Sequence, residues 1–324
     1  MNMEIKSDLE EYVYEIAEHV SSELRNTLDI STVRWVSRPE GKSEISDATL
    51  AFYIDGKRYQ DNIVLLVSNY QFPHVVDEDI GKAQAISRLL QSGTQRNVAK
   101  PIFTGSYGIQ SYAVFNRLLP LSDNRLVRYF QKKFTFTPVA DWLLDLAIQT
   151  QRNCVDECEL QRRFAEPIQF ILCDSDMPSE IKRYVEKDLS EALREGLGLF
   201  TVAEHGDFWT GNVLFRRQLA SIISPFMGDF RVIDWRGSNT HGYPCCDLVR
   251  YCLSFYRPDS KSAGSAIRKY NSMLEISEVH FGLYIFASLG RLGMNLDQFP
   301  KDRYITLCKK YFEFIKFHGF VQTP

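Results

Sequence analysis

Apolar residues recur at helical spacing at the start of the chain and then change to short runs. In residues 7–28 the apolar positions lie three or four apart, which predicts an amphipathic helix. Short apolar runs predict strands at residues 33–37, 48–54, 63–67, 100–103 and 111–116, with a second helix at 79–91. The run at 63–67 is apolar at every position, so we expect it in the middle of the sheet.

Beyond Pro120 the pattern becomes mostly helical. One hairpin interrupts it, formed by residues 213–215 and 231–233 and joined by 217–228. The strands of the first part and the helices of the second therefore indicate two lobes that meet near residues 117–121. The helices are expected at residues 138–151, 157–170, 178–195, 247–255, 262–274, 278–292 and 301–317.

Composition sets few limits on function. The 324-residue chain is 44% hydrophobic and 24% charged with a net charge of −3, so nothing indicates a nucleic-acid partner. No apolar run reaches the roughly 18 residues that span a bilayer. Residues 1–9 lack the apolar core of a secretory signal, so we expect no membrane span and a cytoplasmic location. The seven cysteines form no C-x-x-C pair, and we expect reduced thiols rather than a zinc site.

Two short blocks in the second half combine carboxylate and amide side chains. Residues 205–212 read H-G-D-F-W-T-G-N, and residues 232–235 read V-I-D-W at the end of an apolar run. Phosphoryl transfer from ATP uses one carboxylate near the attacking hydroxyl. It also uses an amide oxygen and a second carboxylate to hold Mg²⁺ on the phosphates. The two blocks together contain this set of side chains.

The spacing resembles that of a known family. Protein kinases carry H-R-D-x-x-x-x-N and then D-F-G, whereas here Gly206 replaces the Arg and Asp234-Trp235 replaces Asp-Phe. This variant resembles the aminoglycoside phosphotransferase and choline kinase family, which carries H-G-D-x-x-x-x-N and then I-D-W or I-D-F. The resemblance implies an α+β, bilobal protein-kinase-like fold with a small mixed β-sheet lobe and a larger, mostly helical lobe. We expect an N-terminal helix over 1–29, a small nucleotide-binding lobe over 30–118 and a large catalytic and acceptor-binding lobe over 119–324.

The resemblance also implies roles for individual residues, with ATP and Mg²⁺ as cofactors. Asp207 corresponds to the catalytic base, and Asn212 and Asp234 to the metal ligands. Taken singly, each has a simpler interpretation as a turn, loop or strand-end residue, and only their joint spacing favours the catalytic one. His205 and Asp247 correspond to residues that support the catalytic loop, and Asp247 is also placed to cap a helix.

The part that would hold ATP is less complete. The lysine that the family carries on its third strand falls on Leu66 here. Lys82 on the second predicted helix, or Lys42 in the expected phosphate loop, could meet the phosphates instead, and for both the alternative is a solvated surface lysine. Leu118, in the predicted hinge, is expected beside the adenine.

The predicted function is ATP- and Mg²⁺-dependent transfer of the γ-phosphoryl group to a hydroxyl of a small molecule or glycan. A sugar, an amino alcohol or an aminoglycoside-like compound could be the acceptor, and the mixed charge of the helices after Asp247 disfavours the last. The alternative is a nucleotide-binding, pseudokinase-type regulator without phosphotransfer, which the missing strand lysine motivates. A protein kinase is disfavoured by Gly206 and by the absence of A-P-E after Asp234. The acceptor, the oligomeric state and the pathway stay open. The expected acceptor side chains are Tyr251, Tyr256, Glu275, Glu278 and His280.

Overall fold

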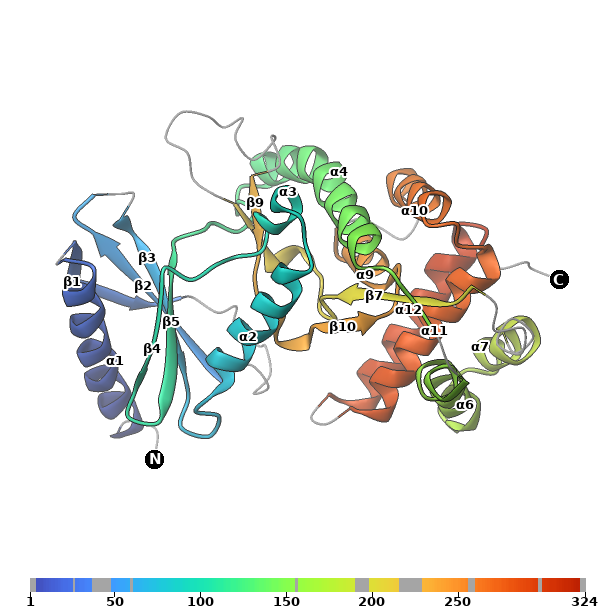
Figure 1. The fold of residues 1–324 in the computed structure, drawn as a ribbon, viewed down its shortest axis with the longest axis horizontal. Coiled ribbons are helices and arrows are strands. Elements are labelled where there is room, and N and C mark those ends of the chain that lie inside the picture. The colour runs from blue at the N-terminus through green and yellow to red at the C-terminus, as the bar shows by residue number, and fades with distance from the viewer. Residues whose placement is uncertain are drawn as a thin grey trace.

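Five strands form the sheet of the small lobe in the order β1-β2-β3-β5-β4. Figure 1 shows this sheet and α1 at one end of the molecule, α2 between the sheet and the large lobe, and helices over most of the other end. The predicted α+β, two-lobed fold is confirmed, although every described pairing in this sheet is antiparallel rather than mixed. The computed structural model describes residues 4–25, 27–36, 48–58, 61–154, 157–189, 198–215, 229–255, 260–296 and 299–320. The elements of the small lobe are α1 (Glu4–Glu23), β1 (Leu28–Trp35), β2 (Thr49–Gly56), β3 (Ile63–Ser68), α2 (Val75–Arg88), α3 (Ser92–Gln95), β4 (Phe103–Tyr107) and β5 (Gln110–Asn116).

The two faces of this sheet have different partners. Ile63, Leu65 and Val67 of β3 are buried in a hydrophobic core that they share with α1. Because successive side chains of a strand point to opposite faces, Leu66 lies on the other face, where it packs against a cluster that includes Val76 of α2. The position expected for the strand lysine therefore holds a leucine beneath α2.

Several predicted boundaries in this lobe are wrong by a few residues, among them the start of α2, which begins at Val75 and not at 79. The helix predicted at 7–28 ends earlier, because Arg25 adopts the left-handed conformation with φ 57°. β1 consequently begins at Leu28. β4 begins at Phe103, three residues later than predicted, since Pro101 has no N–H to donate to a neighbouring strand.

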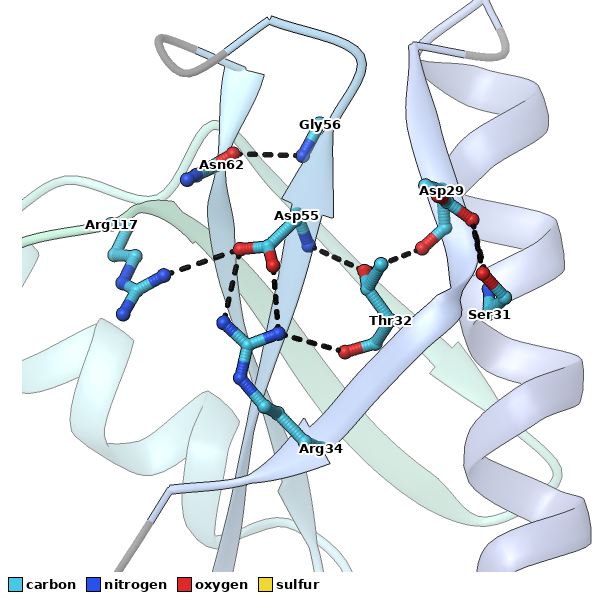
Figure 2. Close-up of polar contacts among 8 residues, drawn as sticks. All are labelled: Asp29, Ser31, Thr32, Arg34, Asp55, Gly56, Asn62 and Arg117. Atoms are coloured by element: carbon cyan, nitrogen blue, oxygen red, sulfur yellow. Dashed lines mark hydrogen bonds and ion pairs between the residues drawn. The ribbon is translucent and has the colours of Figure 1, made fainter.

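A polar cluster joins the edge of the sheet to the hinge (Figure 2). Asp55 on β2 accepts hydrogen bonds from Arg34 on β1 at 2.7 and 3.2 Å and from Arg117 at 3.2 Å. The hydrogen bond from Arg34 holds the pKa of Asp55 below its usual range. The Arg117 guanidinium also lies 4.3 Å from the ring centroid of Tyr53. These contacts fix Arg117, the residue directly before Leu118. Leu118 itself is buried.

Helices make up most of the large lobe. The first of them, α4, runs from Arg125 to Thr150 and contains Pro138, where the prediction had started it. Its first turn is capped by Asn124, whose Oδ1 accepts N–H groups of Leu126 and Val127 at 3.0 and 3.2 Å. An interior proline removes one backbone hydrogen bond and normally kinks or ends a helix, which is why the prediction began there. Here the helix continues through Pro138. The other helices are α5 (Glu157–Leu160), α6 (Glu166–Cys173), α7 (Ser179–Tyr184), α9 (Cys246–Phe255), α10 (Lys261–Met273), α11 (Glu278–Met294) and α12 (Lys301–Phe317), with π-helical turns at Gln161–Ala165 and Val185–Leu189.

Two small sheets lie among these helices. The predicted hairpin is confirmed as β8 (Val213–Phe215) paired with β9 (Phe230–Val232), and the connection at 217–228 lies outside the described residues. A three-stranded sheet, β10-β7-β6, was not predicted. Its middle strand leads directly into the H-G-D block, so this sheet sets where the block begins. The strands are β6 (Arg152–Asn153), β7 (Phe200–Glu204) and β10 (Asn239–Gly242).

The lobes are joined through the hinge. Leu119 exchanges backbone hydrogen bonds of 2.9 and 2.8 Å with Phe215 of β8, and Val98 forms a bridge to Val232 of β9. The division of the chain at residues 29 and 118 stays a prediction, and α1 shares its core with the sheet. In the part of the chain that the structure describes, no helix combines the length and the apolar character that crossing a bilayer requires.

Candidate active site

The two motif blocks are in direct backbone contact. Gly206 has φ +80°, and a Cβ at this position would lie 2.5 Å from the carbonyl oxygen of Gly237. A side chain would therefore be both strained and blocked at Gly206. This explains why the H-G-D block carries glycine where protein kinases carry arginine. The H-G-D loop and the turn Trp235–Gly237 (η7) that follows Asp234 are packed against each other.

His205 connects the two blocks through its ring. It is fully buried, its Nε2 lies 2.9 Å from the carbonyl oxygen of Ile233, and its Nδ1 lies 3.3 Å from the backbone N–H of Asp207. Burial lowers the pKa of His205 to about 4, so the ring is neutral at physiological pH. Nε2 then donates to Ile233 and Nδ1 accepts from Asp207, which fixes one tautomer.

Helix α9 holds the loop from the other side. The two carboxylate oxygens of Asp247 accept the N–H groups of His205 at 2.6 Å and Gly206 at 3.1 Å. One turn later, Arg250 donates to the carbonyl oxygen of Gly206 at 3.0 Å and forms an ion pair with Asp207. Sequence analysis missed Arg250. Its position three residues after Asp247, on the same helix face, was the available signal.

The structure brings Asn212 and Asp234 together with the loop. Asn212 is buried, donates its side-chain N–H to the carbonyl oxygen of Asp207 at 2.9 Å, and accepts the N–H of Ile233 at its own carbonyl at 3.1 Å. Asp234 has φ 63° and ψ 62°, a left-handed conformation that is uncommon for a residue with a side chain. Burial raises the pKa of Asp234, while Arg236 and a hydrogen bond from Asn212 oppose this effect.

The donor set at this point fits Mg²⁺. An amide oxygen and a carboxylate are hard ligands, and Mg²⁺ commonly takes few protein ligands and completes its shell with phosphates and water. Among the described residues no three His, Cys, Asp or Glu side chains form a group that could hold a metal. A site built by Asn212 and Asp234 would thus need the nucleotide phosphates to complete it.

Helix α2 contacts the same turn from the small lobe. Asp79 accepts the backbone N–H groups of Trp235 and Arg236, and its other oxygen, Oδ1, has no hydrogen-bond partner among the described residues. Burial and then the nearby Asp234 raise the pKa of Asp79 to about 7. Lys82, one turn later, donates to the carbonyl oxygen of Arg236. Sequence analysis named Lys82 but missed Asp79.

Three other residues that the sequence suggested are not seen at the site. Lys42 and Tyr256 lie outside the described residues. Tyr251, expected at the acceptor surface, is instead buried against Phe208 of the H-G-D block, because an aromatic ring on the inner face of α9 packs into the core.

Two acidic side chains lie beneath the loop, Asp247 buried and Glu204 half-buried. Glu204, directly before the H-G-D block, accepts the N–H of Tyr243 at 3.1 Å. It occupies space that a Cβ on Gly242 would fill. Burial, and then the charge of Asp247, raise the pKa of Glu204 from 4.5 to about 8. Burial also raises the pKa of Asp247, from 3.8 to about 6. The pair therefore binds protons more tightly in the folded chain than in the unfolded chain.

Glu204→Gln should flatten the dependence of stability on pH. Because both folded pKa values are raised, the stability that they contribute is complete below the ordinary pKa values and is lost as pH rises through about 6 to about 8. We expect the melting temperature of the wild type to fall between about pH 5 and about pH 9, and that of Glu204→Gln to fall less. Differential scanning fluorimetry measures this, with Glu313→Gln, an exposed position on α12, as control. Parallel curves for Glu204→Gln and the wild type would contradict the raised pKa.

Comparisons with known proteins agree with the fold. No family model and no curated protein sequence matches the chain. Solved structures do, and one is a thermostable mutant of aminoglycoside phosphotransferase APH(4)-Ia in a complex with ADP and hygromycin B. It has a TM-score of 0.51 and 14% sequence identity, over 93% of this chain and 98% of that chain.

Two further similar structures are kinases of other small molecules. A putative fructosamine-3-kinase from Haemophilus somnus has a TM-score of 0.49 and 12% identity, over 89% of this chain and 91% of that chain. An ethanolamine kinase of Plasmodium vivax has a TM-score of 0.47 and 12% identity, over 90% and 85%. At such identities the likeness concerns the fold alone. The chain thus has the protein-kinase-like fold that the motif blocks predicted, which it shares with APH(4)-Ia.

Proposed function

We propose that the protein is an ATP- and Mg²⁺-dependent phosphotransferase that moves the γ-phosphoryl group to a hydroxyl of a small molecule or glycan. The observation that carries this proposal is the convergence of Asp207, Asn212 and Asp234. One carboxylate lies on the H-G-D loop, and the second lies on a turn bonded to that loop. Since the phosphoryl donor is ATP, we expect the enzyme to work in the cytoplasm.

Asp207 would orient the acceptor hydroxyl and accept its proton. Its side chain is partly exposed, at 41%, which leaves it within reach of a substrate. Arg250 contacts the carboxylate and the loop backbone together, so it holds Asp207 in one orientation. A base that is already positioned contributes to the rate, because less ordering is needed in the transition state.

Asn212 and Asp234 would hold Mg²⁺, which neutralises charge on the transferring phosphates. The negative charge of Asp234 is costly in its crowded surroundings, as the raised pKa indicates, and a bound cation would relieve that cost. Lys82 and Lys42 remain the candidates for the second cation at the phosphates. Leu118, in the anchored hinge, is our candidate for contact with the adenine.

The acceptor is proposed to be a sugar or an intermediate of a surface polysaccharide. The helices after Asp247 carry Arg268 and Lys269 beside Glu275 and Glu278, and a polycationic aminoglycoside would favour a predominantly acidic surface. APH(4)-Ia is a relative in fold only, so its hygromycin B complex does not assign an acceptor here.

A nucleotide-binding regulator without phosphotransfer is the second candidate. The regulator is favoured by Leu66, on the face of the sheet beneath α2, because this position holds no lysine to meet the phosphates. Asp207, Asn212 and Asp234 in one site favour catalysis. The two candidates differ in turnover and agree in Mg-ATP binding.

Substitutions at the two carboxylates should separate chemistry from binding. Asp207→Asn should lower kcat by at least ~10²-fold through loss of the base and leave Mg-ATP affinity unchanged. Asp234→Asn should abolish Mg²⁺-dependent ATP binding, since it removes the charged metal ligand. Turnover is followed by coupled ADP release with a panel of sugars and amino alcohols, and affinity by calorimetry. Asp302→Asn, exposed on α12, is the control. Near-normal turnover in a folded Asp207→Asn protein would refute the assignment. Mg-ATP binding without turnover on any acceptor would favour the regulator.

Lys82→Met tests the replacement for the strand lysine. The ammonium group lies at the carbonyl oxygen of Arg236, beside the turn that follows Asp234. We expect the KM for ATP to rise, or kcat to fall, several-fold without loss of folding. Lys42→Met is the matched comparison. A silent Lys82→Met beside a severe Lys42→Met would show that the cation comes from the phosphate loop.

A further inference from the structure

The first turns of α4 turn an apolar face toward solvent. Five large apolar side chains between Leu126 and Phe134 are exposed, with Leu126 at 73% and Tyr129 at 61%. Figure 1 shows α4 along the upper edge of the large lobe in this view. Monomeric soluble proteins rarely group exposed apolar side chains in this way, and such groups mark interaction surfaces. We call Leu126, Val127, Tyr129, Phe130 and Phe134 the α4 apolar face.

This face is a built feature of the helix. Leu126, Phe130 and Phe134 are four residues apart and therefore lie along one line of the helix. Thr135 and Phe136, on the opposite side, are buried. A helix on the surface of a globular protein normally directs its apolar stripe to the core, whereas here a second stripe points outward.

The helix that carries this face is firmly anchored. The Asn124 cap fixes its start. The Lys132 ammonium donates to the carbonyl oxygen of Phe255 at the end of α9, at 3.0 Å. Gln131 accepts the N–H of Ser122 at 2.7 Å. The apolar face is thus presented by an ordered helix.

Positive charge accompanies the apolar face. Arg125 and Lys133 are both exposed on the same turns, and no acidic residue occurs between Arg125 and Asp141. Two further cations of these turns have partners within the protein: Lys132 contacts Phe255 and Arg128 contacts Asp123. Asp123, directly before the Asn124 cap, pairs with Arg128 at 3.0 Å. The whole chain carries a net charge of −3, so this cluster is a local excess of cations.

The positive charge beside the apolar face favours an anionic lipid surface over a second copy of this chain as the partner. In a two-fold dimer built on this face, the same patch would meet itself and oppose like charges. An anionic lipid surface instead satisfies both features, because apolar side chains enter the boundary between headgroups and acyl chains while arginine and lysine contact the phosphates. We propose that the α4 apolar face and its cations dock the protein on anionic lipid surfaces.

Docking of this kind is peripheral. The apolar stripe covers only the first turns of one helix, in agreement with the absence of a spanning helix among the described residues. Phe136 stacks on Tyr251, which packs on Phe208 of the H-G-D block. The surface-bound protein would therefore hold its catalytic loop at a fixed orientation to the lipid. This inference is independent of the phosphotransfer proposal.

Vesicle co-sedimentation of the full chain tests the proposal. We expect the wild type to bind vesicles of phosphatidylcholine with phosphatidylserine, to bind phosphatidylcholine alone weakly, and to lose affinity as salt is added. The double variant Leu126→Ser, Phe130→Ser should bind about tenfold more weakly or worse, since affinity follows the buried apolar area. Arg125→Gln and Lys133→Gln should each cost about fivefold.

The controls separate this face from other exposed apolar side chains. Met273→Ser and Phe317→Ser change positions that are 58% and 59% exposed elsewhere, and both should bind as the wild type does. All variants should keep the wild-type melting temperature, because the replaced side chains are exposed. Absence of binding to anionic vesicles, or equal binding by the Leu126/Phe130 variant, would overturn the proposal. So would a concentration-dependent dimer, seen by sedimentation velocity, that this variant abolishes, since the face would then be a self-association interface.

Discussion

The structure of the site depends on one carboxylate, that of Asp247. Its two oxygens take the N–H groups of His205 and Gly206, which are the first two residues of the H-G-D block. Arg250, one turn along α9, then holds the carbonyl oxygen of Gly206 and the Asp207 side chain. The loop is thereby hydrogen-bonded to α9 both through its N–H groups and through a carbonyl oxygen. This arrangement requires a buried charge, and the raised pKa of Asp247 reflects it.

The H-G-D loop in turn holds the turn that follows Asp234. Gly206 admits the backbone of Gly237, and the neutral ring of His205 reaches Ile233. Asp79 and Lys82 of α2 bond the backbone of the same turn from the small lobe. The proposed base and metal ligand are therefore positioned by one network that includes both lobes.

Patterns of neighbouring residues predicted those elements whose formation depends mainly on interactions between residues close in the sequence. The apolar run at 63–67 became the middle strand, and the hairpin of β8 and β9 formed where its two runs predicted. The H-G-D and I-D-W spacing predicted that Asp207, Asn212 and Asp234 lie close together, and Asn212 contacts both aspartates. Their roles stay a prediction. These features depend on periodicity and on residue types that few other sites require.

The parts that sequence analysis missed depend on contacts between distant segments. β7 and β10 pair only because the intervening residues bring them together, and neither strand has a strong pattern of its own. Asp79 looks like an ordinary acidic residue in the first turns of a helix until the Trp235 turn lies beside it. α4 begins well before Pro138 because Asn124 caps its first turn. Sequence analysis placed the start at the proline and therefore missed the cap. Tertiary packing settles such cases, and a single sequence does not record it.

The central claim is that the H-G-D loop and the Asp234 turn together hold one metal on the phosphates of ATP. A crystal of the protein with Mn²⁺ and a non-hydrolysable ATP analogue tests it most directly, through the anomalous signal of manganese. Our account predicts a manganese peak coordinated by Asn212 Oδ1 and the Asp234 carboxylate, with the γ-phosphate directed toward Asp207. A manganese peak away from Asp234, or a nucleotide bound outside the space between the two lobes, would contradict it.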